Sequence, residues 1–142
     1  MSSDNAAARR IVVGIDGSGP SLAAMEWAAR QAEFTGSALE TVIVWQVAIS
    51  YGSAMPLADP EAEARKVLDS AVGDLQKAHP QVEIRSSVVE GIPAQVLVEA
   101  SNDADLLVVG SRGHGEVAGL LIGSVSEHCV THAHCPVLVM RH

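Results

Sequence analysis

Short runs of apolar residues alternate along this chain with longer segments in which apolar residues recur at helical spacing. The run at 11–15 is short and apolar, which is typical of a buried strand, and strands are also predicted at 41–47, 104–109 and 136–140. If the last of these is an edge strand, its apolar residues need covering. A further run, at 82–88, roughly alternates apolar and polar residues, and this predicts a sheet-edge strand with one exposed face. The pattern therefore predicts five strands.

Helix signals fill the segments between these runs. Asp59 is a capping residue directly before a proline and an acidic residue, and Gly36 is placed to end the first helix. Helices are expected over about 20–34, from Asp59 to His79-Pro80, from Gly91-Ile92-Pro93 onward, and over 124–132, with a surface loop at 49–57. The inward faces are expected to carry Leu22, Met25, Ala29 and Ala32 in the first helix, Ala64, Val67, Leu68, Ala71, Val72 and Leu75 in the second, and Val96, Leu97 and Ala100 in the third.

This alternation of strands and helices predicts a three-layer α/β fold with a parallel sheet and right-handed crossovers. In such sheets, ligands bind beyond the carboxyl ends of the strands, where the strand order reverses. The strands at 11–15 and 104–109 end near Gly14 and Asp16 and near Gly110 and Gly113. If these strands are neighbours, those residues converge on one crevice.

Composition and charge narrow the class of protein. The chain has 142 residues, and we expect a flexible terminus over 1–9 followed by a single domain over 10–142. The net charge of −8 argues against a nucleic-acid partner, which would need a basic face. The sequence contains neither a membrane span nor a secretory leader pattern, and its two cysteines make no disulfide framework, so we expect a cytoplasmic protein.

The segment from Val108 to Glu127 carries the strongest candidate chemistry. Gly110, Gly113, Gly123 and Ser124 place a glycine-rich loop between a strand and a helix, where free backbone N–H groups and the helix dipole favour a phosphate. On their own, these glycines could equally be turn formers. Other phosphate loops fit poorly, because no lysine follows the last glycine and the glycines at 14, 17 and 19 have the dinucleotide spacing reversed.

Three residues at or near the predicted crevice have two interpretations each. Ser124 begins an S-x-x-E capping box that ends at Glu127, and the same N–H groups could also face a phosphate. Asp16 is either a turn acid or the residue that bridges to Mg²⁺ beside a triphosphate. Arg112 is either a solvated surface residue or a group that neutralises phosphate charge.

The segment from His128 to Cys135 reads HCVTHAHC and raises the question of zinc. His128 and His132 share a helix face at i,i+4, but the usual cysteine spacing is missing and the segment crosses a helix end. A structural metal is therefore the less favoured interpretation, as is a disulfide between Cys129 and Cys135. His114 is the only candidate base in the glycine loop, and an exposed loop histidine is the simpler interpretation.

The glycine pattern G-x2-G-x9-G-S, the opening IVVGIDGS, the segment VVEGIPAQVLVEAS and the closing CPVLVM together resemble the universal stress protein family across essentially the whole chain. The resemblance implies a Rossmann-like fold with strand order 3-2-1-4-5, ATP as cofactor, Mg²⁺ with the nucleotide, and a homodimer formed through the last strand. Some members carry proline where this chain has Gly14. Carried over by position, the site would comprise Gly14, Asp16 (also the metal residue), Val44, Gly110, Ser111, Arg112, Gly113, Gly123, Ser124, Val125 and Ser126.

Several functions follow from this resemblance and remain open. The leading one is a regulatory nucleotide-binding protein whose ATP occupancy changes its surface for partners. A slow ATPase, a sensor of another adenine nucleotide such as cyclic AMP, and a nucleotide-free scaffold are the alternatives. The loop offers groups that hold phosphates but little catalytic chemistry, so binding is favoured over turnover.

Overall fold

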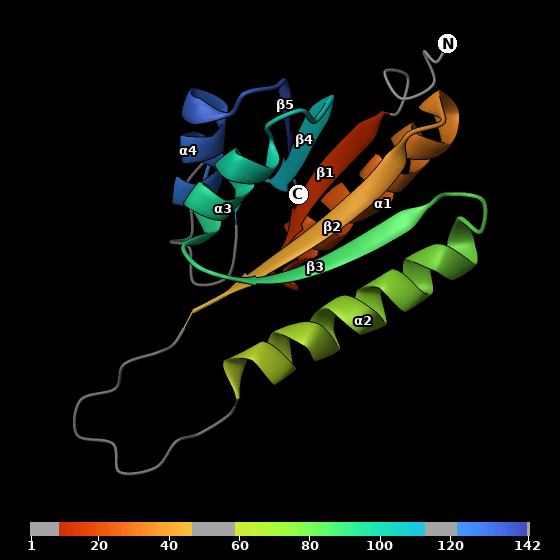
Figure 1. Ribbon diagram of the computed structural model, residues 1–142, viewed down its shortest axis with the longest axis horizontal. Coiled ribbons are helices and arrows are strands. Elements are labelled where there is room, and N and C mark those ends of the chain that lie inside the picture. Colours follow the sequence, from red (N-terminus) through yellow and green to blue (C-terminus); the bar gives the residue numbers. More distant parts are fainter. Residues whose placement is uncertain (1–8, 47–58, 113–121, 142) are drawn as a thin grey trace.

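The computed structural model describes residues 9–46, 59–112 and 122–141, which form a five-stranded parallel sheet flanked by helices. The strand order is β3-β2-β1-β4-β5, so the predicted α/β class and the order 3-2-1-4-5 are confirmed. Figure 1 shows α1 and α2 on one face of the sheet and α3 and α4 on the other. The elements are β1 (Arg10–Ile15), α1 (Gly19–Thr35), β2 (Ala38–Trp45), α2 (Pro60–Ala78), β3 (Ile84–Glu90), α3 (Pro93–Ala100), β4 (Leu106–Gly110), α4 (Ser124–His132) and β5 (Val137–Met140).

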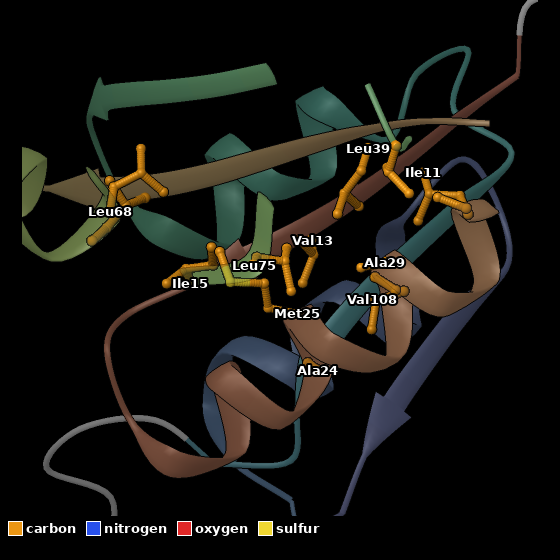
Figure 2. Packing of buried hydrophobic residues seen from close by; sticks show 14 of the residues in the cluster. Ile11, Val13, Ile15, Ala24, Met25, Ala29, Leu39, Leu68, Leu75 and Val108 are labelled. Carbon is orange, nitrogen blue, oxygen red and sulfur yellow. The ribbon is translucent and has the colours of Figure 1, made fainter. Parts of the chain in front are cut away.

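The sheet separates two apolar cores because successive strand residues point to opposite faces. Ile11, Val13 and Ile15 of β1 pack with α1 and α2, as Figure 2 shows, whereas Val12 packs on the other face with Leu97 of α3. The buried face of α1 is largely alanine, which lets this helix lie close to β1 and β4. The two cores fix both helix layers against the strands whose ends form the cavity described below.

Capping residues set the helix starts at both α1 and α2. The Ser18 hydroxyl accepts a hydrogen bond from the Ser21 N–H, and Gly36 ends α1 in the left-handed conformation at φ 74°. Asp59 Oδ1 accepts from the N–H groups of Glu61 and Ala62 at 3.1 and 3.2 Å. The predicted start of the second helix at Asp59 is therefore confirmed.

The structure corrects several local predictions. β2 begins at Ala38 rather than at residue 41, because its first residues already pair with β1. Leu22 and Val67 were expected to face inward but are 42% and 39% exposed. Each lies at the margin of a buried stripe that smaller or neighbouring residues fill. The predicted loop at 49–57 and the terminal residues 1–8 lie outside the described residues.

A buried histidine joins α2 to α1. His79 follows the last residue of α2, and its Nε2 and Nδ1 lie 2.9 Å from Glu26 and 3.3 Å from Glu33, both on α1. Carboxylates only accept hydrogen bonds, so both contacts are made when both ring nitrogens carry protons. The hydrogen bond with Glu26 raises the pKa of His79 above its usual 6.5, against the opposing effect of burial.

This contact predicts a pH-dependent stability. Because the folded-state pKa of His79 is raised, the stabilisation is fully present below pH 6.5 and is lost as pH rises through the raised pKa. Urea unfolding of the wild type and of the Glu26→Gln/Glu33→Gln variant should show a stability difference that shrinks toward alkaline pH. A difference that grows with pH would contradict this assignment.

Candidate functional site

A cavity of about 260 Å³ opens at the carboxyl ends of β1, β2 and β4. β1 and β4 are neighbours in the sheet, so the crevice predicted for this pair of strands is present at the point where the strand order reverses. Among the described residues, the lining consists of Gly14, Ile15, Asp16, Ser21, Val42, Val44, Pro93, Leu97, Val109, Gly110, Arg112, Gly123, Val125 and Ser126.

On the β1 side, Gly14 and Asp16 have structural reasons for their identities. A Cβ at Gly14 would lie 2.7 Å from Leu97 Cδ1, so a side chain there would push Leu97 of α3. Asp16 Oδ1 accepts from the Ser18 N–H at 2.9 Å, and the Asp16 N–H donates to the Ser21 hydroxyl at 3.2 Å. Asp16 therefore shapes the turn into α1 and at the same time borders the cavity.

On the β4 side, Gly110 allows α1 to approach the end of the strand. A Cβ at Gly110 would lie 2.8 Å from the Pro20 carbonyl carbon and 3.0 Å from the Ser21 nitrogen. Contacts this short with backbone atoms cannot be relieved by a side-chain rotation. Arg112 follows two residues later, half-buried in the cavity wall, and with Asp16 it supplies the charge among the described lining residues.

The amino end of α4 forms the third wall. Gly123 is the capping residue in extended conformation, and its carbonyl accepts a helical hydrogen bond from the Glu127 N–H at 2.9 Å. The N–H groups of Val125 and Ser126 precede that bond, and such groups at a helix start favour an anion. Both residues line the cavity, where the start of α4 faces the end of β4 at Gly110.

The predicted capping box at Ser124 is wrong. Ser124 is the first residue of α4 rather than its cap, and the cap makes no side-chain hydrogen bond because Gly123 occupies that position. The start of α4 is instead stabilised by hydrogen bonds from the Ser126 side chain. Its buried hydroxyl lies 3.1 Å from the carbonyls of both Ser111 and Gly123.

The structure brings most of the predicted site residues together. Ser111 and Ser124 are not among the cavity lining, since Ser111 is buried and Ser124 is exposed on α4. Gly113 and the candidate base His114 lie outside the described residues. The predicted residues that line the cavity are Gly14, Asp16, Val44, Gly110, Arg112, Gly123, Val125 and Ser126.

Ser21, Pro93 and Leu97 also line the cavity, although sequence reasoning did not select them. Leu97 was predicted to face inward from its helical spacing, and it does, at 4% exposed. Ser21 had only a weak sequence signal for a role in the site, since it directly follows the cluster of turn residues after the first strand. Its 4% exposure and its contact with Asp16 make it a support for the β1 turn.

The segment from His128 to Cys135 is a packing element. Among the described residues, no group of three His, Cys, Asp or Glu side chains is arranged to hold a metal ion. His128 and His132 stack with ring centroids 4.3 Å apart. Burial raises the pKa of Cys129 to about 11, so this thiol is protonated at neutral pH.

Comparison with known proteins agrees with this architecture. The model of the universal stress protein family matches residues 7–141. The chain belongs to the universal stress protein family. A universal stress protein of Mycobacterium tuberculosis is 36% identical over 132 residues, which cover 92% of this chain and 44% of the relative. This universal stress protein chain therefore spans about half the length of the curated relatives it matches.

Solved structures show the same fold. A universal stress protein in complex with cAMP has a TM-score of 0.71 and 30% identity, covering 93% of this chain and 95% of that one. A universal stress protein from Archaeoglobus fulgidus in complex with dAMP has a TM-score of 0.71 and 22% identity, covering 93% of this chain and 97% of the other. None of the helices within the described ranges is long and apolar enough to cross a membrane.

Proposed function

We propose that this universal stress protein binds ATP with Mg²⁺ in the cavity between β1, β4 and α4, and acts as a cytoplasmic regulatory protein. The observation that carries the proposal is the convergence of the α4 N-terminus, Gly110 and Arg112 on one cavity. An adenine nucleotide is supported by the relative at 30% identity whose structure holds cAMP. Within that class, the family resemblance carried by the glycine pattern implies ATP.

The residues fit such a ligand by their chemistry. The N–H groups of Val125 and Ser126 would hold phosphate oxygens at the start of α4, and Arg112 would neutralise phosphate charge. The Val44 backbone would meet the base. Asp16 would hold Mg²⁺ directly or through water, since this ion retains water and needs few protein ligands. Magnesium would supply charge neutralisation between the carboxylate and the phosphates.

Binding rather than turnover is the proposed activity. The charged side chains among the described lining residues are one carboxylate and one guanidinium. Asp16 is already engaged with the Ser18 N–H, so its geometry suits turn formation and ion binding better than proton abstraction. The proposed consequence of occupancy is a changed surface for a regulatory partner.

We also propose that two copies pair along β5. β5 is an edge strand in which Val137, Leu138, Val139 and Met140 are all half-buried. An apolar edge strand is a ready template for pairing and is normally covered. Sedimentation at micromolar concentration should give the mass of a dimer, and a monomer throughout that range would contradict this part of the proposal.

Arg112→Ala tests the nucleotide assignment. It should weaken Mg·ATP binding about tenfold in calorimetry, because a charge-assisted hydrogen bond to phosphate is lost. Arg65→Ala, an exposed arginine of α2, is the matched control and should leave the affinity unchanged. Equal affinities for all three proteins would remove Arg112 from the site. Titration of cAMP against bound ATP decides between the two nucleotides, and preference for cAMP would overturn the ATP assignment.

A further inference from the structure

Ser111 connects the edge strand β5 with the amino end of α4. Its N–H donates to the Met140 carbonyl at 2.7 Å, which extends the β4–β5 ladder by one bond. Its carbonyl accepts from the Gly123 N–H at 2.6 Å and from the Ser126 hydroxyl at 3.1 Å. The backbone of one buried residue therefore joins the end of β5 to the first residues of α4.

The Ser126 hydroxyl closes this connection. It is 2% exposed and lies 3.1 Å from both the Ser111 and the Gly123 carbonyls. With its proton directed at carbonyl oxygens, the hydroxyl holds Ser111 against the start of α4, and the backbone N–H of Ser126 is left as the group suited to an anion. Ser126 is thus a positioning residue for the cavity.

The same contacts decide which backbone groups β5 presents outward. The carbonyls of Pro136 and Met140 accept from β4, at 3.0 Å from Leu107 and 2.7 Å from Ser111. Backbone groups alternate in direction along a strand, so those of Val137 and Val139 face the open edge. Ser111 therefore fixes Met140. Met140 follows Val139, which is the last residue of β5 whose backbone groups face the open edge.

We propose that nucleotide binding at the α4 N-terminus and pairing of a second copy along β5 are energetically coupled. The coupling runs through the backbone N–H and carbonyl of Ser111 and the hydroxyl of Ser126. The inference rests on the proposed function, which supplies both events. A ligand that holds Gly123 and Ser126 also holds Ser111 and, through it, Met140. A second copy then pairs with an edge strand whose position the bound nucleotide already fixes. Nucleotide binding and dimerisation therefore strengthen each other by linked amounts.

The test measures the dimer dissociation constant by analytical ultracentrifugation, with and without saturating Mg·ATP. Wild type should dimerise about tenfold more tightly with ATP. Ser126→Ala removes the hydroxyl that links Ser111 to α4. With its own ATP affinity measured first and its site then saturated, ATP should change its dimer constant by less than about twofold. Thr131→Ala is the matched control, because its hydroxyl bonds only within α4, to the Glu127 carbonyl at 2.9 Å, and it should keep the tenfold effect.

Reciprocity provides a second readout that needs no variant. Wild-type protein should bind ATP about threefold more tightly at concentrations where it is dimeric than where it is monomeric, because the tenfold change in the dimer constant is shared between two nucleotide sites. An ATP-independent dimer constant in a protein that binds ATP and dimerises would overturn the coupling alone, as would full coupling in Ser126→Ala. If the protein does not bind ATP, or does not dimerise, the proposed function is overturned as well. The binding and sedimentation measurements on the wild type identify that case.

Discussion

Gly110→Ala is expected to lower the free energy of unfolding by about 1–3 kcal/mol. It should also weaken Mg·ATP binding much more than a substitution of an exposed residue does. The new Cβ would lie 2.8 Å from the Pro20 carbonyl carbon and 2.9 Å from Pro20 Cβ. The first turn of α1 would have to move, and Ser21 with it. Since Ser21 contacts the Asp16 N–H, the displacement reaches the β1 wall of the cavity. Urea unfolding and calorimetry measure the two effects.

Gly73→Ala is the control for this substitution. Gly73 lies within α2, and a Cβ there meets nothing within 4 Å. Alanine in a helix is more favourable than glycine, so this variant should gain about 0.5–1 kcal/mol and bind ATP as the wild type does. If Gly110→Ala matches the wild type in both stability and affinity, the close approach of α1 to β4 does not shape the site.

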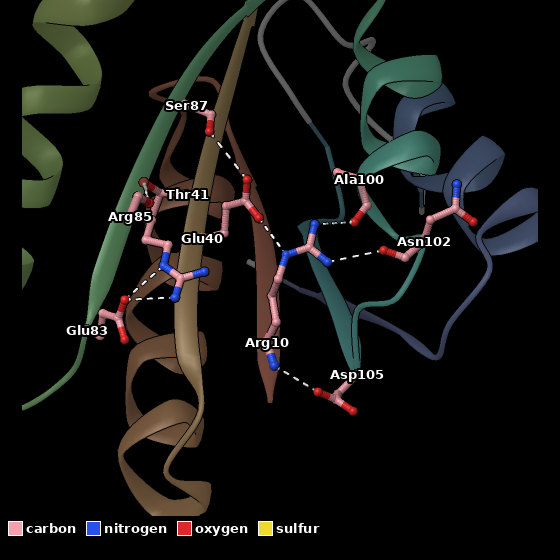
Figure 3. A network of polar contacts seen from close by, with 9 residues as sticks. All are labelled: Arg10, Glu40, Thr41, Glu83, Arg85, Ser87, Ala100, Asn102 and Asp105. Atoms are coloured by element: carbon pink, nitrogen blue, oxygen red, sulfur yellow. Dashed lines mark hydrogen bonds and ion pairs between the residues drawn. The ribbon is translucent and has the colours of Figure 1, made fainter. Parts of the chain in front are cut away.

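Arg10→Ala is expected to cost about 3 kcal/mol, the lower end of the range for breaking a buried ion pair. Figure 3 shows the Arg10 guanidinium between Glu40 of β2 and the carbonyls of Ala100 and Asn102 at the end of α3. Its Nε lies 2.7 Å from Glu40 Oε1, and the Arg10 and Glu40 side chains are only 24% and 22% exposed. Removing Arg10 leaves a carboxylate and two carbonyls without this donor.

A double substitution separates the ion pair from its isolated charges. Arg10→Met/Glu40→Met removes both partners while keeping most of the apolar volume, so it should be more stable than Arg10→Ala. Thermal and urea unfolding give the comparison. A double variant less stable than the single one would mean that Glu40 stabilises the fold without Arg10, through contacts such as that with the Ser87 hydroxyl at 3.3 Å.

The elements with strong local signals were predictable from the sequence. The start of α2 at Asp59-Pro60 follows from capping chemistry, which acts over a few residues. The predicted range of 124–132 also matches α4, although its capping box was wrong. The strand order came from the family resemblance, because apolar runs do not state which strands are neighbours. Leu22 was misassigned because the buried face of α1 is set by how closely its alanines approach the sheet.

The site was predictable in its glycines and less so in its serines. Gly110 and Gly123 border the cavity as the spacing suggested. Ser111 and Ser126 have roles that depend on contacts across 15 residues of sequence, between the end of β4 and the start of α4. Spacing alone cannot separate a serine that faces a ligand from one that holds the loop. The Ser124 capping box failed for the same reason, since Gly123 takes the cap position.

The most direct test of the central claim is an amide NMR titration of this 14.8 kDa chain with Mg·ATP. The account predicts saturable shifts of the amide signals of Gly110, Arg112, Val125 and Ser126, with those of α2 unchanged. Absence of saturable shifts, or shifts that map to α2 and leave the α4 N-terminus unmoved, would contradict an ATP site in this cavity.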